Sequence, residues 1–212
     1  MMQFNADLYR IAAAFVSKEE TRYYLQGVFI EPCKSGGVQM TATDGTRLFC
    51  VRDEFGQADQ SGIVRLSPEA MKLCRSKANT ATRVRIEGQD ATIERQVETT
   101  EDWQPIGLSG KVFIDGTFPD YRRVVPTRIE RDATNPGHPW FAGRQMASFA
   151  DAAMELEKLS GRGSKAALCW RASDAESPAL VLFGASPHAF GVLMPVRGCP
   201  AWTSPPAWFL QT

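Results

Sequence analysis

The chain has 212 residues, of which 43% are apolar and 23% charged, a composition typical of a globular domain with a buried core. Lysine plus arginine and aspartate plus glutamate both total 24, so any contact with nucleic acid needs a local basic surface. The five cysteines are scattered without a C-x-x-C pair, and only two histidines are present. These counts argue against a disulfide framework, a zinc site and a histidine-based catalytic site.

No apolar run is long enough to cross a membrane. The segment from Met1 to Phe15 lacks the basic and then apolar layout of a signal peptide. Unclustered cysteines favour reduced thiols. We therefore expect a soluble cytoplasmic protein without a metal or other cofactor.

Hydrophobic periodicity predicts three helices. The first follows a helix cap at Asn5, and the second opens with Ser67-Pro68-Glu69, where serine caps and proline fits the first turn. The three helices are expected at residues 6–17, 67–77 and 144–159. The apolar face of the third is expected to contain Met146, Phe149, Ala150, Ala153 and Leu156.

Runs of β-branched, aromatic and apolar residues between turn signals predict short strands. Asp44-Gly45 is a strong tight-turn signal and predicts a hairpin. The strands are expected at residues 21–31, 38–43, 47–51, 63–66, 83–87, 91–95, 111–114, 165–170, 179–183 and 189–194. Helices and strands in this order predict an α+β fold.

Two segments fall outside this pattern. Residues 127–139 are rich in charge, proline and glycine, which predicts a linker or irregular crossover. Residues 199–212 form a tail rich in proline and tryptophan. The tail is compatible with packing on the body, with association, and with occupation of a binding site in cis.

Three segments resemble the bacterial DNA sliding clamp, the β subunit of DNA polymerase III. The first pairs TRYYLQG at residues 21–27 with ATDGTRL at 42–48, similar to the middle domain of the clamp. The second is DGTFPDYRRVVP at 115–126, similar to the segment that closes that domain. The third is VLMPVR at 192–197, similar to the end of the clamp. Their shared order makes the resemblance specific.

The resemblance implies an α+β DNA-clamp fold, with antiparallel sheets and helices on one side. Residues 1–126 would form a complete clamp-like domain similar to the middle one. Residues 140–198 would form half a domain similar to the end of the last one. Nothing corresponds to the first clamp domain or to the first half of the last. The chain is therefore expected to be a shortened relative that works as a homo-oligomer.

In the family these motifs line a pocket that takes a short apolar peptide from polymerases and other partners. Leucine, valine, methionine and proline make an apolar slot, glycine permits close approach and arginine can bond a carbonyl. By position, the resemblance assigns the peptide-binding pocket to Leu25, Thr43, Gly45, Thr46, Arg47, Leu48, Pro126, Val192, Leu193, Met194 and Pro195. The alternative is that these are ordinary strand and turn residues.

Clamps line their hole with basic helices that meet phosphates without reading sequence. Arg22, Tyr23 and Tyr24 match family positions near DNA. The first two helices add candidate DNA-binding residues at Arg10, Lys72, Arg75 and Lys77. On the third helix, Asp151 and Glu155 are expected to face outward and repel phosphate. A solvated helix face is the ordinary alternative explanation of such charges.

We therefore expect a non-catalytic replication or repair factor that binds clamp-interacting peptides and, after assembly, double-stranded DNA without sequence preference. The alternative is an adaptor or decoy that binds clamp partners without encircling DNA. An enzyme on the same scaffold is disfavoured by the scarcity of histidine and of clustered carboxylates. The phosphate-loop-like run at 161–165 follows a helix instead of preceding one, so a helix stop explains it better.

Overall fold

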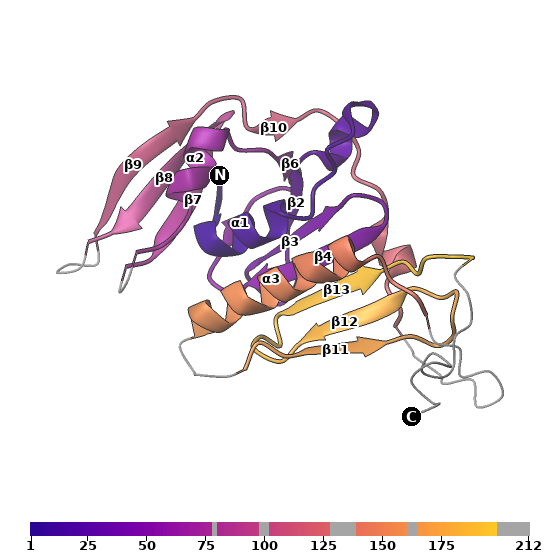
Figure 1. The fold of residues 1–212 in the computed structure, drawn as a ribbon. Coiled ribbons are helices and arrows are strands. Elements are labelled where there is room, and N and C mark those ends of the chain that lie inside the picture. The colour runs from indigo at the N-terminus through magenta and orange to yellow at the C-terminus, as the bar shows by residue number, and fades with distance from the viewer. Residues whose placement is uncertain (78–79, 98–101, 128–138, 161–164, 199–212) are drawn as a thin grey trace, which may run out of the picture.

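The computed structural model describes residues 1–77, 80–97, 102–127, 139–160 and 165–198. Most of the expected linker at 127–139, the helix stop at 161–164 and the tail at 199–212 lie outside the described residues. The elements form two antiparallel sheets with helices packed on them, so the predicted α+β class is confirmed (Figure 1). None of the described helices is long and apolar enough to span a membrane.

The smaller sheet has five strands, all from the first part of the chain. In order across the sheet they are β5 (Gln57–Ala58), β1 (Met2–Asn5), β7 (Thr82–Glu87), β8 (Asp90–Gln96) and β9 (Trp103–Ser109). Apolar alternation explains β1, because Met2 and Phe4 are buried while Gln3 and Asn5 are less so.

The larger sheet has eight strands and joins the two parts of the chain. In order they are β10 (Phe113–Ile114), β6 (Gly62–Val64), β2 (Val28–Pro32), β3 (Val38–Thr43), β4 (Arg47–Asp53), β13 (Ala189–Leu193), β12 (Ala179–Phe183) and β11 (Leu168–Arg171). The junction is the antiparallel pair β4–β13, in which Leu48 lies opposite Val192. Residues far apart in sequence therefore meet at one end of these two strands.

The helices α1 (Ala6–Ala13) and α3 (Gly143–Ser160) lie on one face of the larger sheet, and α2 (Pro68–Leu73) packs by the smaller one (Figure 1). Asn5 caps α1 by accepting from the backbone N–H of Leu8 at 3.0 Å, and Ser67 caps α2 through Ala70 at 3.2 Å. Both predicted caps are confirmed. The segments η1 (Glu20–Leu25) and η2 (Tyr121–Val124) are short 3-10 helices.

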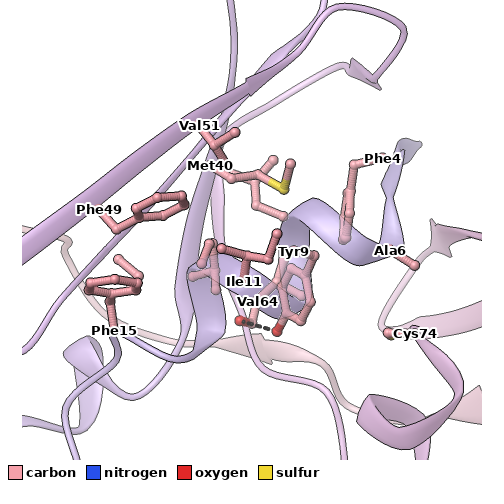
Figure 2. Packing of buried hydrophobic residues seen from close by; sticks show 14 of the residues in the cluster. Phe4, Ala6, Tyr9, Ile11, Phe15, Met40, Phe49, Val51, Val64 and Cys74 are labelled. Carbon is pink, nitrogen blue, oxygen red and sulfur yellow. Dashed lines mark hydrogen bonds between the residues drawn. The ribbon is translucent and has the colours of Figure 1, made fainter. Parts of the chain in front are cut away.

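Between the helices and the sheets lies a layer of fully buried side chains, which we call the helix-facing core. Phe15 stacks on Phe49 with ring centroids 4.8 Å apart and meets Phe149 of α3 at 4.9 Å. Tyr9 is also buried, and its hydroxyl donates to the carbonyl of Val64 at 3.0 Å (Figure 2). This hydroxyl has a partner, so its burial carries no unsatisfied polar group.

Several predicted elements differ from the structure. Residues 21–25 lie in η1 instead of a strand, and β2 begins only at Val28. The aromatic residues Tyr23 and Tyr24 favour a strand locally, but the carbonyl of Tyr23 accepts from the N–H of Gln26 at 3.0 Å and closes a turn. The first two helices are also shorter than predicted, since α1 ends at Ala13 and α2 at Leu73.

The buried face of α3 is Phe149, Ala152, Ala153 and Leu156, so two of the predicted positions are wrong. Met146 is exposed because it lies in the first turn, beside the β3–β4 turn. Ala150 is exposed because one residue along a helix rotates the side chain by about 100° away from Phe149.

Candidate functional site

A second apolar layer lies on the face of the larger sheet that is turned away from α1 and α3. Successive strand residues point to opposite faces, so Phe49 and Val51 belong to the helix-facing core while Leu48 and Cys50 point outward. We call this second layer the outer cluster, and it consists of Leu25, Leu48, Cys50, Ile63, Phe118, Tyr121 and Val192. It is covered by the segment 113–125, from which Phe118 stacks on Phe29 at 4.9 Å.

The β3–β4 turn beside the outer cluster is held by a dense set of hydrogen bonds. The carboxylate of Asp44 accepts from the backbone N–H of Thr46 at 2.9 Å and of Arg47 at 3.1 Å, and from the Thr46 hydroxyl at 2.6 Å. Burial raises the pKa of Asp44, but these hydrogen bonds outweigh it and hold the pKa below its usual value. Gly45 adopts a φ of 91°, which favours glycine.

Arg47 connects this turn to the helices instead of pointing into solvent. Its Nε donates to Asp44 Oδ2 at 2.8 Å, one terminal nitrogen donates to the Ala14 carbonyl at 3.2 Å, and the other donates to the Ser148 hydroxyl. The guanidinium also lies 4.9 Å from the centre of the Phe15 ring. Its place is therefore the helix side of the sheet, where it fixes the turn against α1 and α3.

The end of β13 brings exposed apolar side chains next to the same turn. The N–H of Met194 donates to the Thr46 carbonyl at 2.9 Å, and Gln145 of α3 donates to the Thr46 hydroxyl at 2.6 Å. The N–H of Val196 donates to the Trp140 carbonyl at 2.7 Å. We call the exposed side chains gathered by these contacts the apolar rim, and they are Trp140, Met146, Met194 and Val196.

The structure brings most of the predicted pocket residues together around this turn. Leu25, Leu48 and Val192 lie in the outer cluster, and Thr43, Gly45 and Thr46 form the turn beside it. Met194 is exposed on the rim, Pro195 is half-buried next to it, and the half-buried Pro126 follows Val125, which packs on the outer cluster. Leu193 and Arg47 point to the opposite face of the sheet.

Sequence reasoning did not single out several members of this region. Phe118 and Tyr121 stand in the recognised motif at 115–126 and could have been found there from their aromatic character. Ser148 and Trp140 carry no local signal, because their contacts with the turn and with Val196 bridge long stretches of sequence.

The predicted DNA-binding residues lie in two places. In η1, Arg22 forms an ion pair with Glu19 at 3.2 Å, and the exposed Tyr23 meets Tyr24 edge to face at 5.7 Å. The other group is Arg10 of α1 with Lys72, Arg75 and Lys77 in and after α2, of which the last three are exposed.

Glu155 was predicted to face outward with Asp151, but it is half-buried and lies among cations from three segments. It pairs with Arg10 of α1, with Arg75 at 3.4 Å and with Lys158 at 2.8 Å. Hydrogen bonding to Lys158 is the largest effect and, with Arg10, lowers the pKa of Glu155 from an ordinary 4.5 to about 2. Asp151, one helical turn away, is exposed as predicted.

Comparison with known proteins identifies a curated relative of part of this chain. The chain is 33% identical over 119 residues to the Beta sliding clamp of Caulobacter vibrioides, a match covering 52% of this chain and 29% of that protein. No protein-family model matches the chain. The resemblance inferred from the three motifs is confirmed, and the chain spans less than a third of this curated relative.

Solved structures give the same result at lower identity. The DnaN sliding clamp (DNA polymerase III subunit beta) from Bartonella birtlesii bound to griselimycin matches with a TM-score of 0.63 at 21% identity, over 93% of this chain and 66% of that one. The DNA polymerase sliding clamp from Bacillus subtilis also matches with a TM-score of 0.63, at 16% identity, over 93% and 64%. The chain therefore has the sliding-clamp fold, as predicted.

Proposed function

We propose that this chain acts as a sliding-clamp-like, non-catalytic factor of DNA replication or repair. In this proposal the apolar rim, the β3–β4 turn and the adjoining edge of the outer cluster bind short apolar peptides of polymerases or other partner proteins. The similarity to the beta sliding clamp and the clamp fold support it.

The observation that carries the proposal is the junction of β4 with β13. This pairing brings residues 43–48 and 192–196, which come from different parts of the chain, to one turn held by Asp44, Thr46 and Arg47. Exposed apolar side chains beside a rigid, hydrogen-bonded turn are suited to a peptide that brings its own apolar side chains. The methionines of the rim would adapt to several such sequences.

The wider proposal concerns DNA and assembly. Lys72, Arg75 and Lys77 are exposed in and after α2, which suits sequence-independent contact with phosphates. We take residues 1–126 as one complete clamp-like domain and 140–198 as half a domain. A ring around DNA would then require a homo-oligomer.

The test is a titration of a labelled clamp-binding peptide into the protein, followed by fluorescence anisotropy. The Met194→Ala, Val196→Ala double variant removes two side chains of the rim, and we expect it to weaken binding about tenfold or more. The control is Leu108→Ala, because Leu108 is equally apolar and 75% exposed but lies on β9 of the other sheet. Equal binding by all three proteins, or none by the wild type, would refute the proposed site.

The assembly is tested separately. Light scattering measures the oligomeric state, and a retention assay measures whether the protein stays on circular DNA. A homo-oligomer that stays on circular DNA and leaves after linearisation would support encirclement. A monomer that binds the peptide but is not retained would instead identify an adaptor that binds clamp partners without a ring.

A further inference from the structure

A cleft of mixed polar and apolar lining lies between the start of α1, the segment after α2 and the second half of α3, apart from the peptide site. Its volume is ≈ 630 Å³. The basic side chains of Arg75, Lys77 and Lys158 line it, together with the small polar residues Ser76 and Thr80. Cations and hydroxyls around one hollow are the groups that bind phosphate oxygens.

Glu155 also lines this cleft and occupies the position in which an anion would meet those cations. Its carboxylate pairs with Lys158 at 2.8 Å and with Arg75 at 3.4 Å, and it accepts from Arg10 of α1. The Nε of Arg10 is buried and has no hydrogen-bond partner among the described residues. Arg10 does not line the cleft, so the cationic donors that a ligand there can reach are those of Arg75, Lys77 and Lys158.

The remaining charge of the cleft is positive. Among the described residues that line the cleft, the three cations Arg75, Lys77 and Lys158 outnumber the two carboxylates, which are those of Asp7 and Glu155. Asp7 is buried and accepts from the N–H of Ser76, so it is tied to the backbone. Glu155 is thus the acid whose charge offsets that of the cations around the cleft.

We propose that the cleft is a contact site for the phosphate backbone of duplex DNA, and that Glu155 is a built-in competitor for it. This inference rests on the DNA contact in the proposed function and adds its regulation. A phosphate entering the cleft must replace Glu155 on Arg75 and Lys158, so part of its binding energy is spent on breaking existing ion pairs. The result is weak attachment, which suits a protein that slides on DNA instead of holding one position.

The test compares two variants that each remove one negative charge from α3. Glu155→Gln keeps the shape of the side chain but abolishes the competing charge. Asp151→Asn, one turn earlier on the same helix, changes the net charge equally at a residue that has no ion pair among those described. The measurement is anisotropy of a labelled duplex over a series of salt concentrations, with inorganic phosphate added at constant ionic strength in a parallel series.

For Glu155→Gln we expect about five- to tenfold tighter binding and a steeper dependence on salt, by roughly one additional phosphate contact. For Asp151→Asn we expect less than about a twofold change. Inorganic phosphate should compete only weakly, because a single ion lacks the neighbouring phosphates of the duplex. Strong competition would mean that a single phosphate ion fills the cleft as well as the duplex does, which would overturn the assignment of duplex DNA as its particular ligand.

Equal effects of the two variants would overturn the inference, because they would reflect net charge alone. A third variant, Lys77→Ala, keeps the test valid if Glu155→Gln does not fold. It removes an exposed cation of the cleft and should weaken binding and flatten the salt dependence. Unchanged DNA binding in both Glu155→Gln and Lys77→Ala would refute the site. The peptide titration on the same samples separates this failure from failure of the proposed function.

Discussion

The larger sheet carries an apolar layer on each face, and the two layers differ in what covers them. The helix-facing core is covered by α1 and α3, and its rings of Phe15, Phe49 and Phe149 are fully buried. The outer cluster is covered by the segment 113–125, and apolar side chains remain exposed beside it at Met194 and Val196. We infer that the first layer supplies stability, whereas the second leaves a surface on which a partner can be recognised.

The largest effect on stability is expected from a cavity in the helix-facing core. Phe149 is fully buried and contacts Phe15, Trp170 and Phe183. We expect Phe149→Ala to lower the free energy of unfolding by about 3–5 kcal/mol, measured by urea denaturation. Met154→Ala on the same helix, where the side chain is 46% exposed, should change it by less than about 0.5 kcal/mol. Similar losses of unfolding free energy in both variants would mean that α3 is not part of the helix-facing core.

The next effect concerns the ion pairs that fasten α3 to α1 and to the segment after α2. The pKa of Glu155 is about 2 in the folded protein against an ordinary 4.5, so its ionised form stabilises the fold. This contribution is complete above pH 4.5 and is lost as the pH falls through 2. We expect Glu155→Gln to cost about 2 kcal/mol at neutral pH and only a small fraction of that near pH 2.

Urea denaturation across that pH range measures the difference between the wild type and Glu155→Gln. Asp151→Asn serves as the control, and its difference from the wild type should stay close to zero throughout. A Glu155→Gln difference that is constant from pH 7 to 2 would mean that the ion pairs add no net stability.

The sequence was sufficient for elements whose local signals agree. The strands β3 and β12 were predicted at the observed bounds, because runs of β-forming residues end there at turn signals. It was insufficient where contacts between distant segments determine the local structure. Pro105 and Gly107 are poor strand formers, yet β9 forms because β8 offers a partner strand. The aromatic pair in η1 favoured a strand that the structure does not contain.

The features of the candidate site also divide into those that the sequence could predict and those that it could not. The turn at Asp44-Gly45 and the apolar residues around Val192 lie in local motifs, so their positions could be predicted. The direction of each side chain could not, since Leu193 and Arg47 face the helices while Val192 and Leu48 face outward. The contacts of Glu155 with Arg10 and Arg75 join three segments, and no local pattern encodes them.

A smaller effect on stability is expected in the outer cluster, at the hydroxyl of Tyr121. The hydroxyl of Tyr121 donates to Glu31 Oε1 at 2.5 Å and accepts from Gln39. We expect Tyr121→Phe to lower the free energy of unfolding by about 1.5 kcal/mol, measured by urea denaturation, which is the low end for a hydrogen bond to a charged group because Glu31 keeps Arg122 and Gln39 as partners. Tyr23→Phe, at an exposed ring, is the control and should have no measurable effect. A loss of several kcal/mol would make the outer cluster as tightly integrated as the helix-facing core.

The smallest expected effect decides whether the recognition surface extends onto α3. Met146 is 37% exposed in the first turn of the helix, next to Gln145, which bonds the β3–β4 turn. We expect Met146→Ala to leave the free energy of unfolding within about 0.5 kcal/mol of the wild type. It should nevertheless weaken binding of the labelled clamp-binding peptide about threefold, since truncating a contact at the margin of an interface costs less than truncating one at its centre.

Met154→Ala is the matched control, because it removes the same exposed side chain from the same helix about two turns farther on. Equal peptide affinity in the two variants would confine recognition to the β3–β4 turn and the end of β13. Weaker binding by Met146→Ala alone would mean that one helix serves both layers, with Phe149 fixed in the helix-facing core and Met146 presented to the peptide.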